Sequence, residues 1–222
     1  MAFNKRKQSD SSGEDDWLVT YADAVTLVLC FFIILFSVSE PSPSAYKELA
    51  ESLAEAGFFD EAQDDPFEVM TESFEVMIEQ NDLEQSMAVE QTDKGMMLEL
   101  SSSSFYQSGS AKFKPEAIPI LKQVVDILRD FNYDAYVIAA DGHTDDVPMR
   151  SALFPSNWEL SGGRSANIVR FFIASGLDQE LMQASGFAET RPKVPNKDTE
   201  GRPIPENREI NRRVVIRVER VD

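Results

Sequence analysis

The longest apolar run of the chain lies near its N-terminus. Residues 17–38 read WLVTYADAVTLVLCFFIILFSV, and Asp23 is the one charged side chain among them. An α-helix of this length, at about 1.5 Å per residue, crosses the roughly 30 Å hydrocarbon core of a bilayer. The run is too long for the core of a signal peptide, and no small-residue cleavage site follows it. The pattern therefore predicts a membrane-spanning helix over 17–39, after a short tail over 1–16.

The basic residues beside this helix predict its orientation. Lys5, Arg6 and Lys7 precede it, whereas Lys47 is the only basic residue within the next twenty or so. Loops rich in Lys and Arg stay in the cytoplasm, so the N-terminus is expected there. The large C-terminal part then lies outside, which is the periplasm of a bacterium with two membranes.

Asp23 is unusual because it falls about 9 Å inside the predicted span. A charge at such a depth costs about 2.5 kcal/mol or more, so a carboxylate there is typical of an ion site, a proton site or a pairing group. The plainer alternative is a carboxylate that snorkels to the interface. Thr26 lies one turn later on the same face and can co-ligate a cation or hydrogen-bond the carboxylate. One helix cannot shield this charge from lipid, so partner helices are implied.

An acidic connector separates the apolar run from the rest of the chain. Residues 40–100 contain seventeen acidic and two basic residues. Such a stretch is typical of a solvated linker, here expected over 40–84, or of an acidic surface suited to a saline exterior. Within it, apolar residues at helical spacing predict an amphipathic helix over 45–59, and a second one over 64–81.

From residue 85 onward the hydrophobic period alternates between that of strands and that of helices. Two short apolar runs flank Thr92-Asp93-Lys94-Gly95, which is a hairpin signal. Helical periodicity follows over 115–131, and Ser156 with Glu159 forms a capping box for a helix that reaches residue 174. Further strands are expected over 135–140, 182–189 and 213–219. The pattern predicts an α+β domain over 85–222, with one layer of helices on a sheet.

Composition and charge narrow the possible functions. The 222 residues have a net charge of −18, which argues against nucleic-acid binding because that needs a basic surface. One cysteine cannot form an internal disulfide, and one cysteine with one histidine cannot form a zinc site. We therefore expect no metal cluster and no bound cofactor, although a lone Ser, Asp or Glu could still carry out chemistry. The absence of enzymatic activity is expected only from the function inferred below, in which no covalent bond is made.

Three polar segments of the C-terminal part carry candidate binding chemistry. They are Gly142-His143-Thr144-Asp145, the run from Asn157 to Ala166 that contains Arg164, and Asn211-Arg212-Arg213. A carboxylate and a guanidinium on neighbouring elements can form a structural ion pair that ties a loop to a helix. They can instead bind a zwitterion, since Arg binds a carboxylate bidentately and Asp binds an ammonium group.

The apolar run resembles the transmembrane helix of flagellar motor stator B subunits, the MotB/PomB family. The matching positions are Tyr21-Ala22-Asp23, Thr26, Phe31-Phe32 and Ser37. The resemblance implies that Asp23 and Thr26 bind the transported cation. Cys30-Phe31-Phe32 is closer to sodium-driven members than to proton-driven ones, so Na⁺ is favoured over H⁺.

The same resemblance implies the partners. Members act as homodimers inside a ring of multi-span A subunits, and the A subunits contact the rotor. A helix placed like the one predicted over 45–59 closes the ion path before assembly, although packing against its dimer mate is an alternative here.

The polar segments resemble the OmpA-like peptidoglycan-binding domain, whose fold is a βαβαβ sandwich. The resemblance rests on Thr144-Asp145, the N-x-x-L-S-x-x-R run from Asn157 to Arg164, and the late Asn-Arg-Arg. It implies that Asp145 binds the amino group of diaminopimelate and that Arg164 binds its carboxylate. It also implies that Thr144, Asn157, Leu160 and Arg212 shape the pocket, while His143 is structural.

Together these features predict the B subunit of an ion-driven flagellar stator, which conducts cations and is anchored to peptidoglycan. It would lie in the bacterial inner membrane with its C-terminal domain in the periplasm. Two alternatives remain. A passive wall tether would need no Asp23, and a stator-like motor outside the flagellum, for defence or gliding, would keep every motif.

Overall fold

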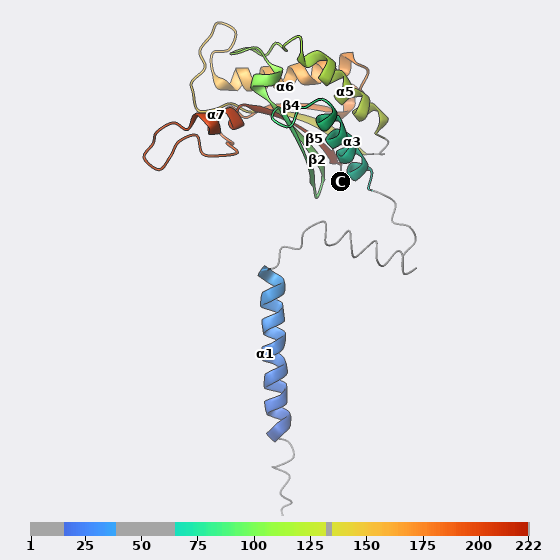
Figure 1. Cartoon of the computed structure of the whole chain (residues 1–222), viewed down its shortest axis with the longest axis vertical. Coiled ribbons are helices and arrows are strands. Elements are labelled where there is room, and N and C mark those ends of the chain that lie inside the picture. Colours follow the sequence, from blue (N-terminus) through green and yellow to red (C-terminus); the bar gives the residue numbers. More distant parts are fainter. Residues whose placement is uncertain (1–15, 39–64, 132–134, 222) are drawn as a thin grey trace, which may run out of the picture. The chain divides into compact units, whose positions relative to one another are not determined.

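The computed structural model describes residues 16–38, 65–131 and 135–221. The chain divides into two compact units, Met1–Gln63 and Asp64–Asp222, and each is described by itself (Figure 1). In the first unit, helix α1 spans Asp16–Val38. Its segment Trp17–Ile34 is long and apolar enough to cross a membrane, as the sequence pattern predicted. The helix expected over 45–59 lies outside the described residues.

The second unit begins with helix α3, Pro66–Gln80. Asp65 caps this helix, because its carboxylate accepts a hydrogen bond of 3.1 Å from the Phe67 N–H, and Pro66 fits the first turn, where no backbone donor is needed. The apolar face of α3 is buried in the core of the unit: Phe67, Met70, Phe74, Met77 and Ile78.

This packing corrects the expected domain boundary. The linker predicted over 40–84 includes α3, but α3 belongs to the folded C-terminal unit, which begins at Asp64 rather than at residue 85. Phe67 and Phe74 are completely buried. An amphipathic pattern shows that one face of a helix is buried but does not show against what, and the acidic outer face of α3 gave it the composition of a linker.

A five-stranded mixed sheet forms the centre of the second unit, in the order β1-β2-β5-β3-β4. Only β3 and β4 pair in parallel, and the other neighbours are antiparallel. The strands are β1 (Met87–Thr92), β2 (Gly95–Ser101), β3 (Tyr136–Gly142), β4 (Met182–Gly186) and β5 (Arg213–Arg220). The predicted hairpin is confirmed, with Thr92 opposite Gly95.

The helices form one layer on this sheet (Figure 1). Alternate residues of the central strands, such as Leu98 and Ile216, are buried in one core with residues of α3, α5 and α6. Helix α5 spans Ala117–Asp130, and α6 spans Asn157–Ala174 and starts with the predicted capping box. Three short helices did not stand out in the sequence: α4 (Ser102–Phe105), the 3₁₀ turn η1 (Gln179–Leu181) and α7 (Pro205–Asn211).

Two glycines let α6 lie unusually close to the sheet. A Cβ on Gly142, at the end of β3, would lie 2.1 Å from the carbonyl oxygen of Ser161, and one on Gly186, at the end of β4, would lie 2.5 Å from the Gly162 amide nitrogen. Any larger residue at these strand ends would push the helix away. The contact therefore fixes the height of α6 above the loop that follows β3, where Thr144 and Asp145 lie.

His143 follows β3 and is packed as a structural residue. Its ring stacks on Phe187 at a centroid distance of 5.3 Å, and its side chain is buried. Burial, together with the positive charges of the nearby Arg213 and Arg191, lowers the pKa of His143 to about 4. His143 is thus neutral at physiological pH, which agrees with the structural role expected for it.

The packing of α3 predicts that a fragment starting at residue 85 is much less stable than one starting at residue 64. Burial of Phe67 and Phe74 alone is worth about 1.5–3 kcal/mol each. We expect the shorter fragment to lose more than about 4 kcal/mol of unfolding free energy in urea titrations followed by circular dichroism. Phe74→Ala should cost about 3–5 kcal/mol, while Val76→Ala on the exposed face of α3 should change little. Equal midpoints for both fragments would contradict this packing.

The buried neutral His143 predicts a specific loss of stability in mild acid. In the unfolded chain this histidine protonates below about pH 6.5, but in the folded chain only near pH 4. The contribution of His143 to the free energy of unfolding is therefore fully present above pH 6.5 and is lost as the pH falls toward 4. At pH 5 the loss amounts to about 2 kcal/mol. From pH 7 to pH 5 the unfolding free energy of the parent should fall by about 2 kcal/mol more than that of the His143→Gln variant. Urea unfolding of residues 64–222 provides the measurement. The same loss in both proteins would show that His143 does not carry the effect.

Candidate functional site

The strongest candidate for a binding site is a pocket of about 350 Å³ in the C-terminal unit. Helix α4, the loop that follows it, the middle of α6 and the junction between α7 and β5 form its walls. The pocket is lined by Ser102, Ser103, Tyr106, Gln107, Ser108, Gly109, Lys114, Arg164 and Arg212. It is therefore a polar pocket with three basic side chains and no acidic one.

Arg164 is the most deeply buried cation of this pocket. It is only 4% exposed, and its guanidinium lies over the ring of Tyr106, 5.3 Å from the ring centroid. Its Nε donates a 3.0 Å hydrogen bond to the carbonyl oxygen of Ser110, and the Tyr106 hydroxyl donates to the Arg164 carbonyl oxygen at 3.0 Å. Burial lowers the pKa of Arg164, which reflects the cost of keeping this charge out of water.

Within the described residues, no carboxylate forms an ion pair with Arg164. The sequence pattern suggested a functional pair between Asp145 and Arg164, but in the structure Asp145 pairs with Arg212, at 2.5 Å between Oδ2 and the guanidinium. Arg212 also forms an ion pair with Glu209. A buried cation that faces a pocket without an anionic partner is a ready site for a ligand carboxylate.

A second ion pair supports Arg212 from the same loop. Asp146, next to Asp145, accepts a 2.6 Å hydrogen bond from Nε of Arg208 and lies 3.3 Å from the Lys197 ammonium. The hydrogen bond from Arg208 lowers the pKa of Asp146. Arg208 lies on α7, and Arg212 caps the C-terminal end of this helix one turn later. Two consecutive carboxylates thus hold α7 and the residue that caps its end, an arrangement that the sequence analysis did not find.

The first residue of the Asn-Arg-Arg segment has a structural role. Asn211 is completely buried and makes four hydrogen bonds to the loop before α7: its oxygen accepts from the Lys193 and Val194 N–H groups, and its amide donates to Val194 and Asn196. This loop is therefore fixed against α7, which helps to hold Arg212 at the pocket.

The other residues expected at the site are not part of the pocket lining: Thr144, Asp145, Asn157 and Leu160. Thr144 is buried, and its hydroxyl donates to the carbonyl oxygen of Asp145 at 3.0 Å. The Asn157 amide donates to the carbonyl oxygens of Asp145 and Val147 and to Glu189. Leu160 is 6% exposed on the buried side of α6. Thr144 and Asn157 thus hold the loop that presents Asp145.

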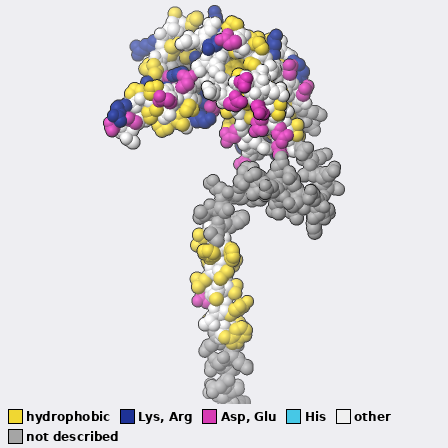
Figure 2. Space-filling view, in the orientation of Figure 1, with side chains coloured by type: hydrophobic (Ala, Val, Ile, Leu, Met, Phe, Trp, Pro, Cys, Tyr) yellow, Lys and Arg dark blue, Asp and Glu magenta, His cyan; other side chains and the backbone are white. Residues whose placement is uncertain are grey.

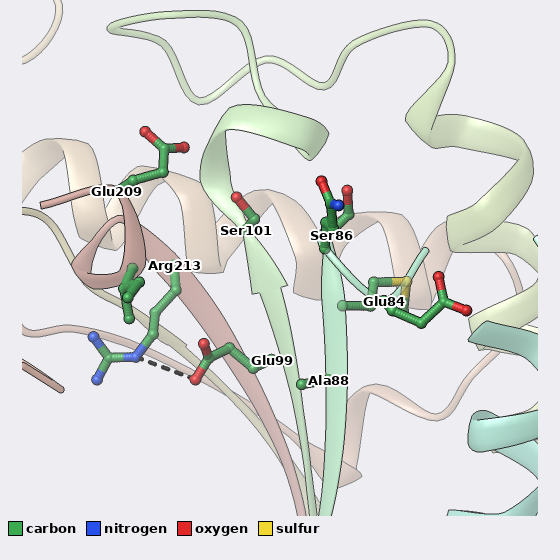
Figure 3. A pocket seen from close by; sticks show the side chains of 10 residues that line it. Glu84, Ser86, Ala88, Glu99, Ser101, Glu209 and Arg213 are labelled. Carbon is green, nitrogen blue, oxygen red and sulfur yellow. Dashed lines mark ion pairs between the residues drawn. The ribbon is translucent and has the colours of Figure 1, made fainter. Parts of the chain in front are cut away.

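A smaller pocket of about 150 Å³ lies where β1, β2 and β5 meet α7 (Figure 3). Its buried cation, Arg213, already has a carboxylate nearby, since Nε lies 3.6 Å from Glu99. The carboxylates of Glu84 and Glu209 point away from Arg213 (Figure 3). These groups do not converge on a common point, so the larger pocket is the better candidate.

In the first unit, helix α1 presents an apolar surface that is interrupted by one acidic side chain (Figure 2). This residue is Asp23, as the sequence analysis expected. The Thr26 hydroxyl donates to the backbone carbonyl oxygen of Asp23 at 2.8 Å, not to its carboxylate. The hydroxyl oxygen keeps its lone pairs, so Thr26 remains able to ligate a cation beside Asp23.

Comparison with known proteins finds a family match for each of the two units. A family model described as "Membrane MotB of proton-channel complex MotA/MotB" matches residues 4–56, and the OmpA family model matches residues 105–205. Six of the nine residues that line the candidate pocket lie within the second match, and Ser102, Ser103 and Arg212 lie outside it. The expected resemblances of the apolar helix and of the polar segments are both confirmed.

Relatives match over nearly the whole chain. The uncharacterized protein YtxE of Bacillus subtilis is 29% identical over 94% of this chain and 92% of its own length. Motility protein B of the same organism is 27% identical over 89% of this chain and 90% of its own length. The order of an apolar helix followed by the C-terminal domain is therefore shared along the full length.

Solved structures match the C-terminal unit. A MotB-like protein from Desulfovibrio vulgaris superimposes with a TM-score of 0.58 at 28% identity, over 70% of this chain and 96% of that protein. The cell wall anchor of the T6SS from Pseudomonas aeruginosa gives a TM-score of 0.56 at 26% identity, over 66% of this chain and 96% of that one. Together, these matches and the helix-plus-domain order support a MotB-family protein with a C-terminal OmpA-like domain.

Proposed function

We propose that this chain is the B subunit of an ion-driven stator, which is anchored to peptidoglycan by its C-terminal domain and carries the ion-binding carboxylate on α1. Membership of the MotB family supports the stator-type anchoring role. The observation that carries the wall-binding part is Arg164, a buried guanidinium that faces a pocket and has no carboxylate partner in the described chain.

Peptidoglycan offers the chemistry that this pocket needs. Its stem peptides contain free carboxylates, and diaminopimelate also has an amino group close to one of them. In our proposal Arg164 binds the carboxylate. Asp145 holds Arg212 at the pocket wall and has lone pairs left for the ammonium group, because each of its oxygens accepts one hydrogen bond, from Val147 N–H and from Arg212.

The membrane part of the proposal rests on Asp23. Its carboxylate lies on a helix whose surface is otherwise apolar, so it requires a partner that shields it from lipid. We propose a second copy of this chain and a multi-span A subunit, as the family implies, with the A subunit contacting the rotor. The orientation that follows is an N-terminus in the cytoplasm and a C-terminal domain in the periplasm. Cation binding would neutralise Asp23 and release would recharge it, and the two states would favour different helix arrangements.

The identity of the cation is part of the proposal. We favour Na⁺ over H⁺ because of the Cys30-Phe31-Phe32 segment and the acidic connector. A passive wall tether is the second candidate function, and the likeness to a secretion-system wall anchor favours it. Such a tether would need no carboxylate in its membrane helix, so Asp23 separates the two candidates.

Loss of the Arg164 guanidinium should strongly weaken wall binding without unfolding the domain. We expect Arg164→Met, which keeps the length of the side chain, to weaken binding of residues 64–222 to purified sacculi by about thirty-fold or more, equivalent to about 2 kcal/mol. Arg170→Met, on the exposed side of the same helix, should bind like the parent. Sedimentation of sacculi with the bound protein, and a thermal melt of each variant, provide the measurement. An Arg164→Met protein that melts and binds like the parent would refute the proposed contact.

Neutralising Asp23 should stop the motor and leave the anchor unaffected. We expect Asp23→Asn to eliminate swimming and cation conduction when it is expressed with the A-type partner, because the carboxylate that binds the cation is gone. Sacculus binding by the full chain should remain at the parental level. Swimming by Asp23→Asn cells at normal speed would instead favour the passive tether.

A further inference from the structure

The binding pocket contains more positive charge than one ligand carboxylate needs. Lys114, Arg164 and Arg212 all line it. Both carboxylates near the pocket, Asp145 and Glu209, pair with Arg212. Among the described residues, the guanidinium of Arg164 and the ammonium of Lys114 have no ion pair. A ligand with a single carboxylate would therefore leave one of these two cations unmatched.

A buried hydroxyl in the same pocket also lacks a partner. Ser102 is 2% exposed and lines the pocket, but its Oγ has no hydrogen-bond partner in the described part of the chain. Its backbone is fixed, because the Ser102 N–H donates to the carbonyl oxygen of Arg212 at 2.8 Å. A buried hydroxyl that donates to nothing is costly, so an acceptor that a ligand brought within its reach would offset this cost.

Lys114 is placed for binding by the local fold. Its backbone N–H donates to the carbonyl oxygen of Phe105 at 3.0 Å, which joins it to the end of α4, next to the bridge between Tyr106 and Phe113. The side chain is half-buried, so its attraction to an anion is less screened than that of a fully exposed lysine. Lys112, two residues earlier, is exposed and does not line the pocket, which makes it a matched control.

We propose that the pocket recognises two free carboxylates of one stem peptide. Arg164 binds the first and Lys114 binds the second, while Ser102 donates a further hydrogen bond. This inference rests on the proposed wall-binding function and specifies its ligand. The volume, about 350 Å³, is at the lower end of ligand pockets and suits one diamino acid with part of its neighbour rather than a glycan strand. The site would thus distinguish stem peptides with free carboxylates from those in which one carboxylate is amidated.

Amidation is a sharp probe because it removes one negative charge with little change in shape. A neutral amide cannot form an ion pair with Lys114, and its NH₂ group is a donor that faces other donors. We expect amidation of the second carboxylate to weaken binding by about ten-fold, the scale of a partly desolvated ion pair. Because Lys114 is the discriminating group, its neutral variant should bind both forms almost equally.

The test uses calorimetric titration of residues 64–222, a unit with its own core, with two synthetic stem tripeptides that end in diaminopimelate. The two peptides differ only in amidation of one carboxylate. The parent and Lys112→Gln should prefer the free form about ten-fold, whereas Lys114→Gln should bind both forms within two-fold of each other. Thermal melts check that each variant is folded.

The remaining outcomes separate this inference from the proposed function. If the parent binds both peptides equally and Arg164→Met binds neither, the pocket does not recognise a second carboxylate. The proposed wall-binding function would then still stand. The same ten-fold preference in Lys114→Gln would also overturn it. Binding of neither peptide by the folded parent would refute the proposed function itself, and with it this inference.

Discussion

The close approach of α6 to the ends of β3 and β4 is the contact on which the binding site depends. Gly142 and Gly186 leave room for the helix backbone at Ser161 and Gly162, at distances that no Cβ would allow. Arg164 follows within one turn, so its height above the sheet is set by this contact. The guanidinium is thereby placed over Tyr106 and in the lining of the pocket, while the Asp145 carboxylate forms its ion pair with Arg212.

Electrostatics then decide which cations are available to a ligand. Asp145 and Asp146 each hold one arginine of α7, and Glu209 adds to the ion pair of Arg212. A fully matched set of charges would stabilise the domain but would leave no binding energy for an anion. In this pocket the carboxylates are concentrated on Arg212, so Arg164 and Lys114 retain the capacity to bind. The cost of burying Arg164 without a partner is the reason to assign it to function rather than to stability.

Local signals in the sequence predicted most of the fold. The turn before Gly95 fixed the β1–β2 hairpin, and the Ser156–Glu159 capping box fixed the start of α6, because both depend on neighbouring residues only. The packing of α3 could not be predicted in this way, since its periodicity shows a buried face but not the surface that covers it. Helix α7 was missed because it is short and lies in a polar segment directly after two prolines, Pro203 and Pro205, the second of which is its first residue.

The site shows the same limit. Of the residues expected at the site, Arg164 and Arg212 line the pocket. The partner of Asp145 was not predicted, because the choice between Arg164 and Arg212 depends on where α7 meets the loop after β3. Asp146 and Arg208 carried no signal for the same reason: they are far apart in sequence and meet only in the folded chain. Lys114 and Ser102 had no distinguishing pattern at all, and only the shape of the pocket brings them to attention.

The central claim is that the buried Arg164 guanidinium binds a ligand carboxylate, and NMR of this side chain tests it most directly. Residues 64–222 labelled with ¹⁵N at arginine side chains would be titrated with a stem tripeptide that ends in diaminopimelate. The account predicts that the Arg164 Nε–H resonance shifts with saturable dependence on peptide concentration, while that of the exposed Arg170 stays in place. Peptide binding that shifts other resonances but leaves Arg164 unchanged would contradict it.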